Sequence, residues 1–475
     1  MASWLRHSDR TGSGRQVGIV VREYRLAKGL NQAAVADALG ITQQFLSQVE
    51  TGVRKVTLDQ RREFMRVLGI PAEELGLAGR CRSGSALNEM STAVSSSRGR
   101  WRMQRHWLNR HRAELGSLAA QWHVDENRVL RTTLITGDGW LADHPSELQS
   151  LRLRLDERPQ AVQITGEEPE TLPVRPLRIP TMSFETYSSA VKHLDPPQLF
   201  ESRPSYRYLG GSMSSRTMDF GLAAYFDKLD VSEALAHEIA AATMNDPDLT
   251  TAELRGKLPF RELIGDPFDT ARRAIIPAIT TLTLRLRRYP AEPTFLLHWR
   301  DPARVATAAG VYDLIPAGEF QPSGVALWDR TNDFSLWRNI VREFSEELLG
   351  RPEHDGSRSS PIDYLRWPLY EQLSDARQRG RLSAFVLGLG LDALTLAATI
   401  LTVVVIDDDL FEDVFGATVR FNEEGEVVAI GESSAAEGLP FNESTIDRLL
   451  DTEPLAAPGA ACLALAWEHR HSLIG

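Results

Sequence analysis

The sequence predicts a multidomain protein in which an all-α N-terminal domain precedes an α/β (α+β) body. At about 150 residues per domain, a chain of 475 residues has room for roughly three domains. Residues 1–80 hold 12 Lys and Arg against 8 Asp and Glu, a net charge of +4, which leaves 41 against 56, or −15, for residues 81–475. Apolar residues recur with a helical period in the first part and form strand-like runs farther on. These observations indicate a basic N-terminal domain on an acidic body.

Composition places the chain among soluble globular proteins, since 42% of its residues are apolar and 25% are charged. Its two cysteines, Cys81 and Cys462, lie far apart, and no apolar stretch with a small-residue cleavage site follows the N-terminus. We therefore expect neither export nor a disulfide framework, and we expect a cytoplasmic protein.

One apolar run, Leu382 to Ile406, is long enough to cross a membrane. Asp392 lies inside this run, and a charge at the centre of a bilayer costs about 2.5–3.5 kcal/mol. Short β-rich runs bounded by polar residues are common in sheets that are covered on both faces. We therefore expect two buried strands, SAFVLGLG and ATILTVVVID, and no membrane partner.

Three short helices are predicted at the start of the N-terminal domain. The first, VGIVVREYRLAKG, ends at Gly29, and the second runs from Gln32 to Leu39. Gly40 can then turn the chain with a positive φ, and Thr42 is a good N-cap for a third helix, Gln43 to about Thr51. Five apolar positions fall where the two steeply crossing helices would share one core: Val35, Leu39, Ile41, Leu46 and Val49.

The polar residues left outside this core predict a DNA-binding surface. Gln43, Gln44 and Ser47 lie on the outer face of the third helix. Glutamine presents a donor and an acceptor together, as the edge of adenine in the major groove requires. Solvation alone would explain any single glutamine, whereas the constellation favours base reading.

Phosphate contacts are predicted beside this face. Gln32 opens the second helix, where its amide and the exposed backbone N–H groups would point toward a phosphate. Arg54 and Lys55 follow the third helix and can add two more phosphate contacts. The predicted DNA-binding residues are Gln32, Thr42, Gln43, Gln44, Ser47, Arg54 and Lys55.

The pattern Q-x-x-V-A-x-x-L-G-I-T-Q-Q-x-x-S-x-V-E-x-G at residues 32–52, with the following helix TLDQRREFMRVLGI, resembles the lambda-repressor-like (XRE) helix-turn-helix family. The resemblance covers about residues 16–77. It implies that Gln32 holds phosphate, that the glutamines opening the third helix read bases, and that Glu50 and Gly52 are structural. Val56 departs from the proline that members often have. Domains of this kind bind as dimers over half-sites about 34 Å apart, so we expect a homodimer on double-stranded operator DNA.

Residues 78–100 are rich in Ser and Gly and are predicted to be a flexible linker. Residues 101–270 are predicted to be an α/β middle domain of unknown role, which opens with a helix, WRMQRHWLNRHRAELGSLAAQW. Four arginines of this helix would either form a solvated face or touch the DNA backbone: Arg102, Arg105, Arg110 and Arg112. A strand, MDFGLAAYF, precedes a helix that we expect to start at Asp230. His237–Glu238 lacks the second histidine of a zinc peptidase motif, because Ala241 stands there.

The C-terminal region begins with strand patterns in TTLTLRLRRYPAEPTFLLHWR and a strand pair with a glycine bend in GVYDLIPAGEFQPSG. An amphipathic helix follows, with Asp333 as its expected N-cap. Glu343, Glu346 and Glu347 share one face of it, where unpaired carboxylates repel unless arginines or a divalent cation neutralise them. Oxygen ligands of this kind suit Mg²⁺ beside a phosphate-containing molecule.

These segments resemble a Nudix domain through REFSEE at 342–347, FLLHWR, and IPAG with Gly318. The resemblance covers about residues 272–440 and implies a Nudix-like α/β/α domain at 271–475, in which the glutamates bind Mg²⁺. Three departures weaken catalysis: a stretched spacing after Gly318, Phe334 in place of a glutamate, and a late glycine at Gly350. The alternatives are a sensor without strong turnover, an active hydrolase, and a coincidental helix with solvated acids.

Together these features predict a sequence-specific transcriptional regulator that responds to a nucleotide-like ligand and resembles actinomycete members of the XRE family. The alternative function is a Nudix-type hydrolase of a nucleoside diphosphate compound fused to a DNA-binding domain. An adaptor that uses its helix-turn-helix for protein contacts is the third possibility.

Overall fold

The computed structural model describes residues 12–71, 74–75, 77, 84–158, 161–197, 200–246, 249–254, 256–289, 291–300, 310–354, 360–416, 425–428 and 438–475. The chain divides into two compact units, Met1–Met90 and Ser91–Gly475. We call the first the N-terminal domain and the second the body, and we describe each by itself. The predicted boundary at residue 270 falls inside the body, which is one of the two compact units.

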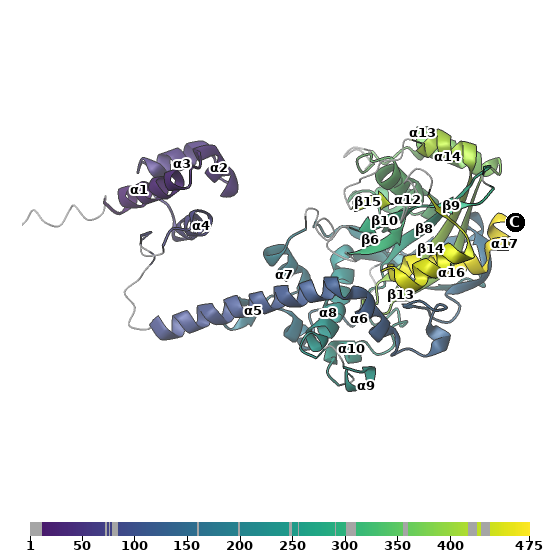
Figure 1. Cartoon of the computed structure of the whole chain (residues 1–475), viewed down its shortest axis with the longest axis horizontal. Coiled ribbons are helices and arrows are strands. Elements are labelled where there is room, and N and C mark those ends of the chain that lie inside the picture. The colour runs from purple at the N-terminus through teal and green to yellow at the C-terminus, as the bar shows by residue number, and fades with distance from the viewer. Residues whose placement is uncertain are drawn as a thin grey trace, which may run out of the picture. The chain divides into compact units, whose positions relative to one another are not determined.

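The N-terminal domain contains the predicted helices (Figure 1): α1 (Gly12–Ala27), α2 (Gln32–Ala38), α3 (Gln43–Glu50) and α4 (Leu58–Leu68). The side chain of Thr42 accepts a hydrogen bond from the amide of Phe45, which confirms it as the N-cap of α3. Gly40 has φ +62°, as the turn requires. A Cβ atom on Gly18 would lie 2.1 Å from the carbonyl oxygen of Val49, so only glycine lets α1 approach α3 this closely.

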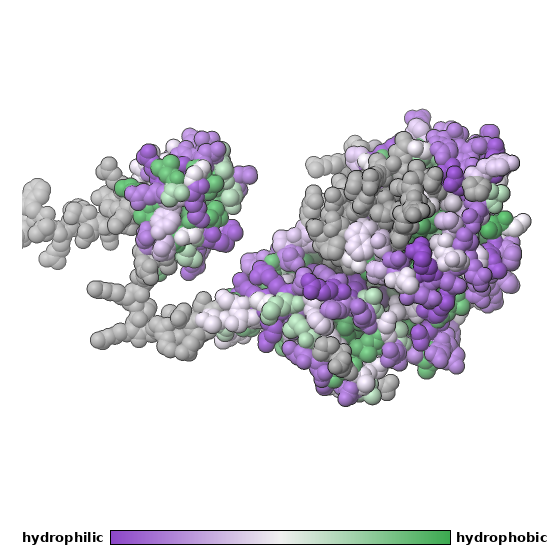
Figure 2. Space-filling model, viewed as in Figure 1, coloured by the Kyte–Doolittle hydropathy of each residue, from purple (hydrophilic) through white to green (hydrophobic). Residues whose placement is uncertain are grey.

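The apolar positions of these helices form one small core. Val35, Leu46 and Val49 are buried, whereas Leu39 and Ile41 are partly buried against them. Figure 2 shows hydrophilic and apolar residues interspersed on the visible face of this domain, and a mostly hydrophilic visible face of the body.

Helix α5 (Gly84–Arg110) corrects the predicted linker, because its residues 84–100 are helical. Contacts within the body hold the C-terminal part of this segment. The Ser97 hydroxyl accepts a hydrogen bond from the Leu177 amide, and the Arg98 guanidinium donates to the Leu177 carbonyl. Trp101, one turn farther on, is buried. The serine-rich composition predicted a linker, but tertiary contacts stabilise a helix here, and the local sequence does not reveal those contacts.

The body is built around an eight-stranded mixed sheet. Its strands lie in the order β1-β13-β14-β8-β9-β16, with β12 also paired to β8 and β2 also paired to β13. Strands β13 and β14 are antiparallel, whereas β14 and β8 are parallel. The bounds of its strands are β1 Leu134–Ile135, β2 Leu141–Glu147, β8 Pro277–Leu286, β9 Thr294–Phe295, β12 Ala317–Glu319, β13 Leu382–Asp392, β14 Ala398–Asp407 and β16 Leu439–Pro440.

Both faces of this sheet are covered. Val404 of β14 packs into one apolar cluster with residues of α12, α13 and α14, whereas Val403 and Val405 face a second cluster that contains Leu463 of α16. The covering helices are α12 (Leu336–Glu343), α13 (Pro368–Gln378), α14 (Asp408–Phe415), α15 (Glu443–Thr452) and α16 (Ala457–Glu468). The two strands predicted within the apolar run are confirmed as β13 and β14. Among the described residues, no helix has the length and apolarity needed to span a membrane.

Smaller sheets and further helices complete the body. The strands are β3 Arg152–Leu155, β4 Leu177–Ile179, β5 Met182–Ser183, β6 Pro204–Ser212, β7 Thr217–Ala224, β10 Leu297–Arg300, β11 Val311–Leu314 and β15 Gly425–Val428. The α-helices are α6 Arg112–Ala120, α7 Tyr187–Leu194, α8 Tyr225–Thr243, α9 Thr251–Leu254, α10 Pro259–Ile264, α11 Asp329–Asn332 and α17 Arg470–Ile474. Short segments of other helix types are Asp125–Asn127, Leu148–Ser150, Pro169–Val174, Phe344–Leu348 and Tyr364–Arg366.

Three local predictions are wrong. Helix α8 begins at Tyr225 and not at Asp230. The Asp230 carboxylate accepts hydrogen bonds from the amide and hydroxyl of Ser188. Ser335, not Asp333, caps α12, because Asp333 is buried and accepts hydrogen bonds from the amide and hydroxyl of Ser323. Strands β11 and β12 do not pair with each other, since β11 pairs with β10 and β12 with β8.

His237 and Glu238 of α8 are structural residues. The imidazole of His237 is buried between the Tyr187 hydroxyl and the Gln104 side chain, each 2.9 Å away, and burial lowers its pKa to about 3. The carboxylate of Glu238 accepts hydrogen bonds from the amides of Phe260 and Arg261 in the first turn of α10. Nothing here resembles a zinc site.

Glu238 gives the body a pH signature, because burial raises the pKa of this carboxyl from 4.5 to about 7. The folded state then holds the proton more tightly than the unfolded state, so stability falls as pH rises from about 4.5 to about 7. At about 1.4 kcal/mol per tenfold change in proton affinity, the loss is about 3 kcal/mol. In Glu238→Gln, we expect the free energy of unfolding relative to the wild type to rise by this amount across that range.

Urea titrations of the full chain at several pH values measure this difference. Glu126→Gln, at an exposed glutamate of the body, serves as the control for the same change of residue type at the surface. A pH-independent difference for Glu238→Gln would contradict the raised pKa.

Candidate nucleic-acid interface

The outer face of α3 presents the residues predicted to read bases. Thr42, Gln43 and Gln44 are exposed and Ser47 is half-buried, whereas Leu46 of the same helix is fully buried in the core. A helix carrying polar side chains on its first turn and on one outer face fits the major groove of DNA. The structure therefore brings these four predicted residues together on one surface.

A buried ion pair fixes the orientation of α3. The guanidinium of Arg25 on α1 donates two hydrogen bonds to the carboxylate of Glu50, at 2.6 and 2.9 Å. Their side chains are 9% and 3% exposed, so the pair is nearly dry. Burial raises the pKa of Glu50, but the hydrogen bonds from Arg25 and Gln32 outweigh this effect and hold that pKa below its usual value. Such a two-pronged pair fixes direction as well as distance.

Gln32 belongs to this buried pair. Its amide nitrogen donates to a Glu50 carboxylate oxygen at 2.8 Å, so the side chain joins α2 to the end of α3. The implied structural role of Glu50 thus has a definite basis in the Arg25 and Gln32 contacts. The contact of Gln32 with phosphate stays a prediction. Arg25 itself was not singled out in the sequence, because it resembles any basic residue of a helix surface.

Arg54 and Lys55 follow α3 and are both exposed. The amide of Arg54 donates to the Gln48 carbonyl at 3.0 Å, and its guanidinium lies over the Phe45 ring, 4.5 Å from the centroid. Stacking on an aromatic ring orders the guanidinium. Lys55 has no such restraint among its described contacts.

The arginines of the middle segment divide between solvent and the interior. Arg110 is exposed, as a solvated face requires. The Arg102 guanidinium donates to the Leu194 carbonyl. Arg105 and Arg112 instead lie inside the body, where both guanidinium groups face Glu233 at 3.6 and 3.8 Å. The predicted solvated face is therefore wrong for these two arginines. Arg105 is buried, so it is not accessible to the DNA backbone either.

Two of the three glutamates proposed as magnesium ligands, Glu343 and Glu347, make hydrogen bonds inside the body. The Glu347 carboxylate accepts a hydrogen bond from the Ala317 amide, and Glu343 accepts one from the Asn339 side chain. The Glu343 carboxylate also fills the space beside Gly318, where a Cβ atom would lie 2.2 Å from it. Among the described residues, no group of three or more His, Cys, Asp or Glu side chains is arranged to hold a metal ion. The magnesium site stays a prediction without geometric support.

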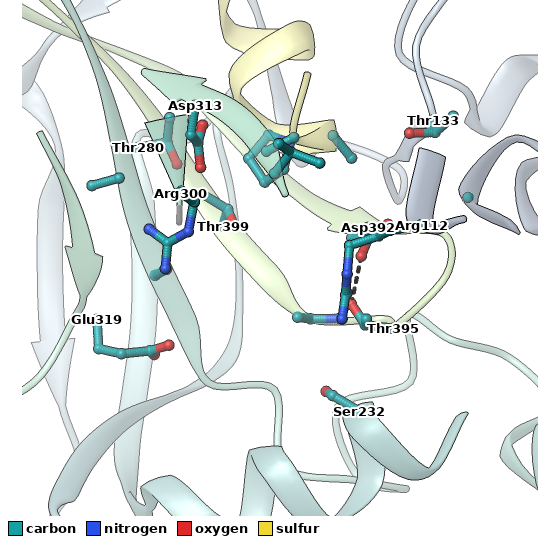
Figure 3. Close-up of a pocket in the computed structure, with 18 of the residues that line it drawn as sticks. Arg112, Thr133, Ser232, Thr280, Arg300, Asp313, Glu319, Asp392, Thr395 and Thr399 are labelled. Carbon is teal, nitrogen blue, oxygen red and sulfur yellow. Dashed lines mark hydrogen bonds between the residues drawn. The ribbon is translucent and has the colours of Figure 1, made fainter. Parts of the chain in front are cut away.

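A cavity of about 260 Å³ in the body was not foreseen from the sequence (Figure 3). Its lining comes from α6, α8, β8, β12, the ends of β13 and β14, and the start of α16, which are far apart in the chain. Several of its polar lining residues are labelled in the figure: Arg112, Thr133, Ser232, Thr280, Glu319 and Thr395.

Comparison with known proteins agrees with the geometry of the N-terminal domain. The helix-turn-helix family HTH_3 matches residues 21–75, which span part of α1 and all of α2, α3 and α4. No curated protein matches the chain. Residues 21–75 are thus a helix-turn-helix domain of XRE type, as DNA-binding transcriptional regulators carry.

Proposed function

Starting from this helix-turn-helix domain, we propose that the protein is a sequence-specific transcriptional regulator that reads operator DNA with α3. The exposed side chains of Gln43 and Gln44, at the capped start of a helix whose orientation is fixed by the Arg25–Glu50 pair, carry this proposal. Ser47 would contact the same groove, and Gln32, Arg54 and Lys55 would hold phosphates.

We further propose that the regulator acts as a homodimer on two half-sites and that the body senses a small molecule. One helix-turn-helix domain buries little surface on DNA, so a second copy would supply affinity and read a two-fold operator. Sensing is favoured over Nudix-type hydrolysis, since Glu343 and Glu347 make contacts inside the body instead of facing the cavity. A bound ligand would act by favouring one of two conformations of the dimer.

DNA recovered with the full-length protein from cells supplies the operator for the test. The protein should retard this DNA more strongly than an unrelated duplex, with an affinity that falls as salt concentration rises. Equal retardation of both duplexes, or retardation that does not depend on salt concentration, would reject sequence-specific binding to the operator and favour an adaptor role.

Neutralising the loop after α3 should weaken binding to every DNA sequence alike. Arg54→Gln and Lys55→Gln should each lower the slope of log affinity against log salt by about 0.9, the value for one lost phosphate contact. Arg62→Gln is the matched control, because Arg62 is exposed on α4 and pairs with Asp59. Retardation at four or more salt concentrations measures the slopes. An unchanged slope for both loop variants would remove these residues from the phosphate contacts.

A further inference from the structure

The cavity of the body has a charged group at its wall that its protein surroundings satisfy poorly. Arg112 opens α6, and its side chain is only 9% exposed. Among the described residues, its guanidinium forms an ion pair with Glu233 at 3.8 Å, which is long for a hydrogen bond. Within the same described part of the chain, its Nε and Nη2 atoms are buried without a hydrogen-bond partner. Buried arginine groups are normally hydrogen-bonded, so an unsatisfied one at a cavity wall points to a missing acceptor.

Hydroxyl groups share the cavity with this guanidinium. Thr133, Ser232 and Thr395 line the cavity with Arg112, and Figure 3 shows Thr395 near it. The Thr395 hydroxyl donates a hydrogen bond to the Asp392 carboxylate, at 2.7 Å. This end of the cavity therefore combines a planar donor of several N–H groups with hydroxyls that can donate or accept.

Acceptors line another part of the cavity. Glu319 of β12 pairs there with Lys228 of α8, and the Oε2 atom of Glu319 is buried with no hydrogen-bond partner in the described part of the chain. Asp313 also belongs to the lining. The ionisable lining comprises three cations and four carboxylates: Arg112, Lys228 and Arg300 against Glu233, Asp313, Glu319 and Asp392.

We propose that this cavity binds a small organic carboxylate that also carries hydroxyl or ammonium donors. The guanidinium of Arg112 matches a carboxylate with two parallel hydrogen bonds. Donors on the remainder of the ligand satisfy the Oε2 atom of Glu319. A diphosphate carries several negative charges, and the lining has three cations but four carboxylates. The excess of acidic groups would therefore repel a diphosphate. At about 260 Å³ the cavity lies just below the range of typical ligand pockets, which suits a small metabolite better than a nucleotide.

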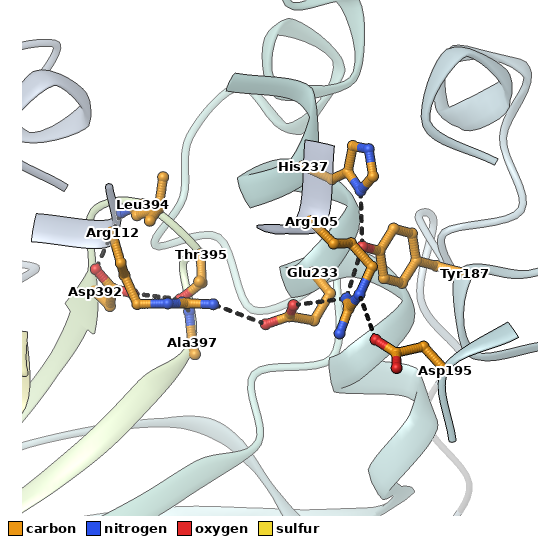
Figure 4. Close-up of polar contacts among 10 residues, drawn as sticks. All are labelled: Arg105, Arg112, Tyr187, Asp195, Glu233, His237, Asp392, Leu394, Thr395 and Ala397. Carbon is orange, nitrogen blue, oxygen red and sulfur yellow. Dashed lines mark hydrogen bonds and ion pairs between the residues drawn. The ribbon is translucent and has the colours of Figure 1, made fainter. Parts of the chain in front are cut away.

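The effect of a ligand bound at Arg112 would be transmitted through Glu233, which lies between two arginines (Figure 4). One oxygen of Glu233 faces Arg112, and the other lies 3.6 Å from Arg105 of α5. Arg105 also donates to the Tyr187 hydroxyl at 3.0 Å and faces Asp195 at 3.7 Å. A ligand carboxylate on Arg112 would compete with Glu233 for this guanidinium and leave Glu233 to Arg105 alone. Helix α5 begins at Gly84, within the last residues of the N-terminal domain, and continues into the body. An effect of the ligand on DNA binding rests on the proposed function, whereas ligand binding itself does not.

Calorimetric titration of the full-length protein, without DNA, tests the site. The probes are a set of 2-hydroxy and 2-amino monocarboxylates and dicarboxylates, each paired with its primary amide. At least one carboxylate should bind, and its amide should bind at least tenfold more weakly. Arg112→Gln should reduce the affinity at least tenfold, whereas Arg110→Gln, at an exposed arginine two residues away, should leave it unchanged.

A second variant keeps the test decisive if Arg112→Gln fails to fold. Gly116 of α6 lines the cavity, and a Cβ atom there meets only Thr133, at 3.8 Å. Leucine at this position favours the helix and would extend into the cavity, so Gly116→Leu should fold and lose binding. Overturning outcomes are the absence of binding by every carboxylate of the set, or binding that both Arg112→Gln and Gly116→Leu retain.

Operator retardation, with and without the carboxylate that binds, separates this site from the proposed function. A ligand-induced change in retardation that Gly116→Leu abolishes would support transmission to the DNA-binding domain. Calorimetric binding with no operator retardation at all would reject the proposed function and leave the ligand site standing. Operator retardation by a protein that binds no carboxylate of the set would reject the ligand site and leave the proposed function standing.

Discussion

Replacing Glu50 by alanine is expected to cost the N-terminal domain about 3–5 kcal/mol of its free energy of unfolding and thereby to abolish operator binding. The change removes both hydrogen bonds to the Arg25 guanidinium, which is 9% exposed, and leaves that charge buried without its partner. It also removes the acceptor that holds Gln32. An uncompensated buried charge costs far more than the net stabilisation by the pair.

Hydrogen exchange across residues 21–75 in the full-length protein measures this loss without interference from the body. The matched control is the double variant Arg25→Met with Glu50→Leu, which replaces both charges by apolar side chains of similar length. It should recover most of the lost stability, because neither charge then remains buried alone. A double variant as unstable as Glu50→Ala would show that the pair is not the reason for the loss.

The same pair predicts how the domain responds to acid. Its hydrogen bonds hold the pKa of Glu50 below the ordinary value of 4.5, so the folded state releases this proton more readily than the unfolded state. The stabilisation is therefore complete above pH 4.5 and is lost as pH falls through the lowered pKa. The protection factors against hydrogen exchange in the N-terminal domain, which correct for the intrinsic effect of pH on the exchange rate, should thus fall in acid more steeply in the wild type than in the double variant.

The N-terminal domain was predictable because its signals are local. Thr42 as N-cap, Gly40 as turn residue and the apolar spacing around Leu46 all act within a few residues of the helices that they define. What the sequence did not show is the pairing of Arg25 with Glu50, which are 25 residues apart. An arginine on a helix surface and one in a buried pair look alike until the tertiary structure is known.

The body was predictable only in part, for the same reason. The short β-rich apolar runs of β13 and β14, bounded by polar residues, are a local pattern, so both strands were predicted correctly. The helical state of residues 84–100 depends on contacts with residues near Leu177, far along the chain. Asp333 had the right chemistry for an N-cap, but the amide and hydroxyl of Ser323 bind it instead. The cavity draws on separate segments of the body and has no local signature at all.

Alanine at both Gln43 and Gln44 is expected to remove operator recognition without weakening the attraction of the protein to DNA in general. Each lost base contact should cost about 1–3 kcal/mol, so the double variant should bind its operator roughly 30-fold to 20,000-fold more weakly. Both side chains are exposed, so the stability of the domain should hardly change. Retardation of operator and unrelated duplexes, at one salt concentration, measures the two affinities.

The contrast with the loop variants identifies what each group of residues reads. Arg54 and Lys55 should affect all duplexes and the salt slope, whereas Gln43 and Gln44 should affect only the operator and leave that slope unchanged. Glu63→Ala is the control, because Glu63 is exposed on α4 and its described ion pair is with Arg66. If the double glutamine variant keeps the full preference for operator over unrelated DNA, then α3 does not read bases through these amides, and the proposed orientation of the domain on DNA must be abandoned.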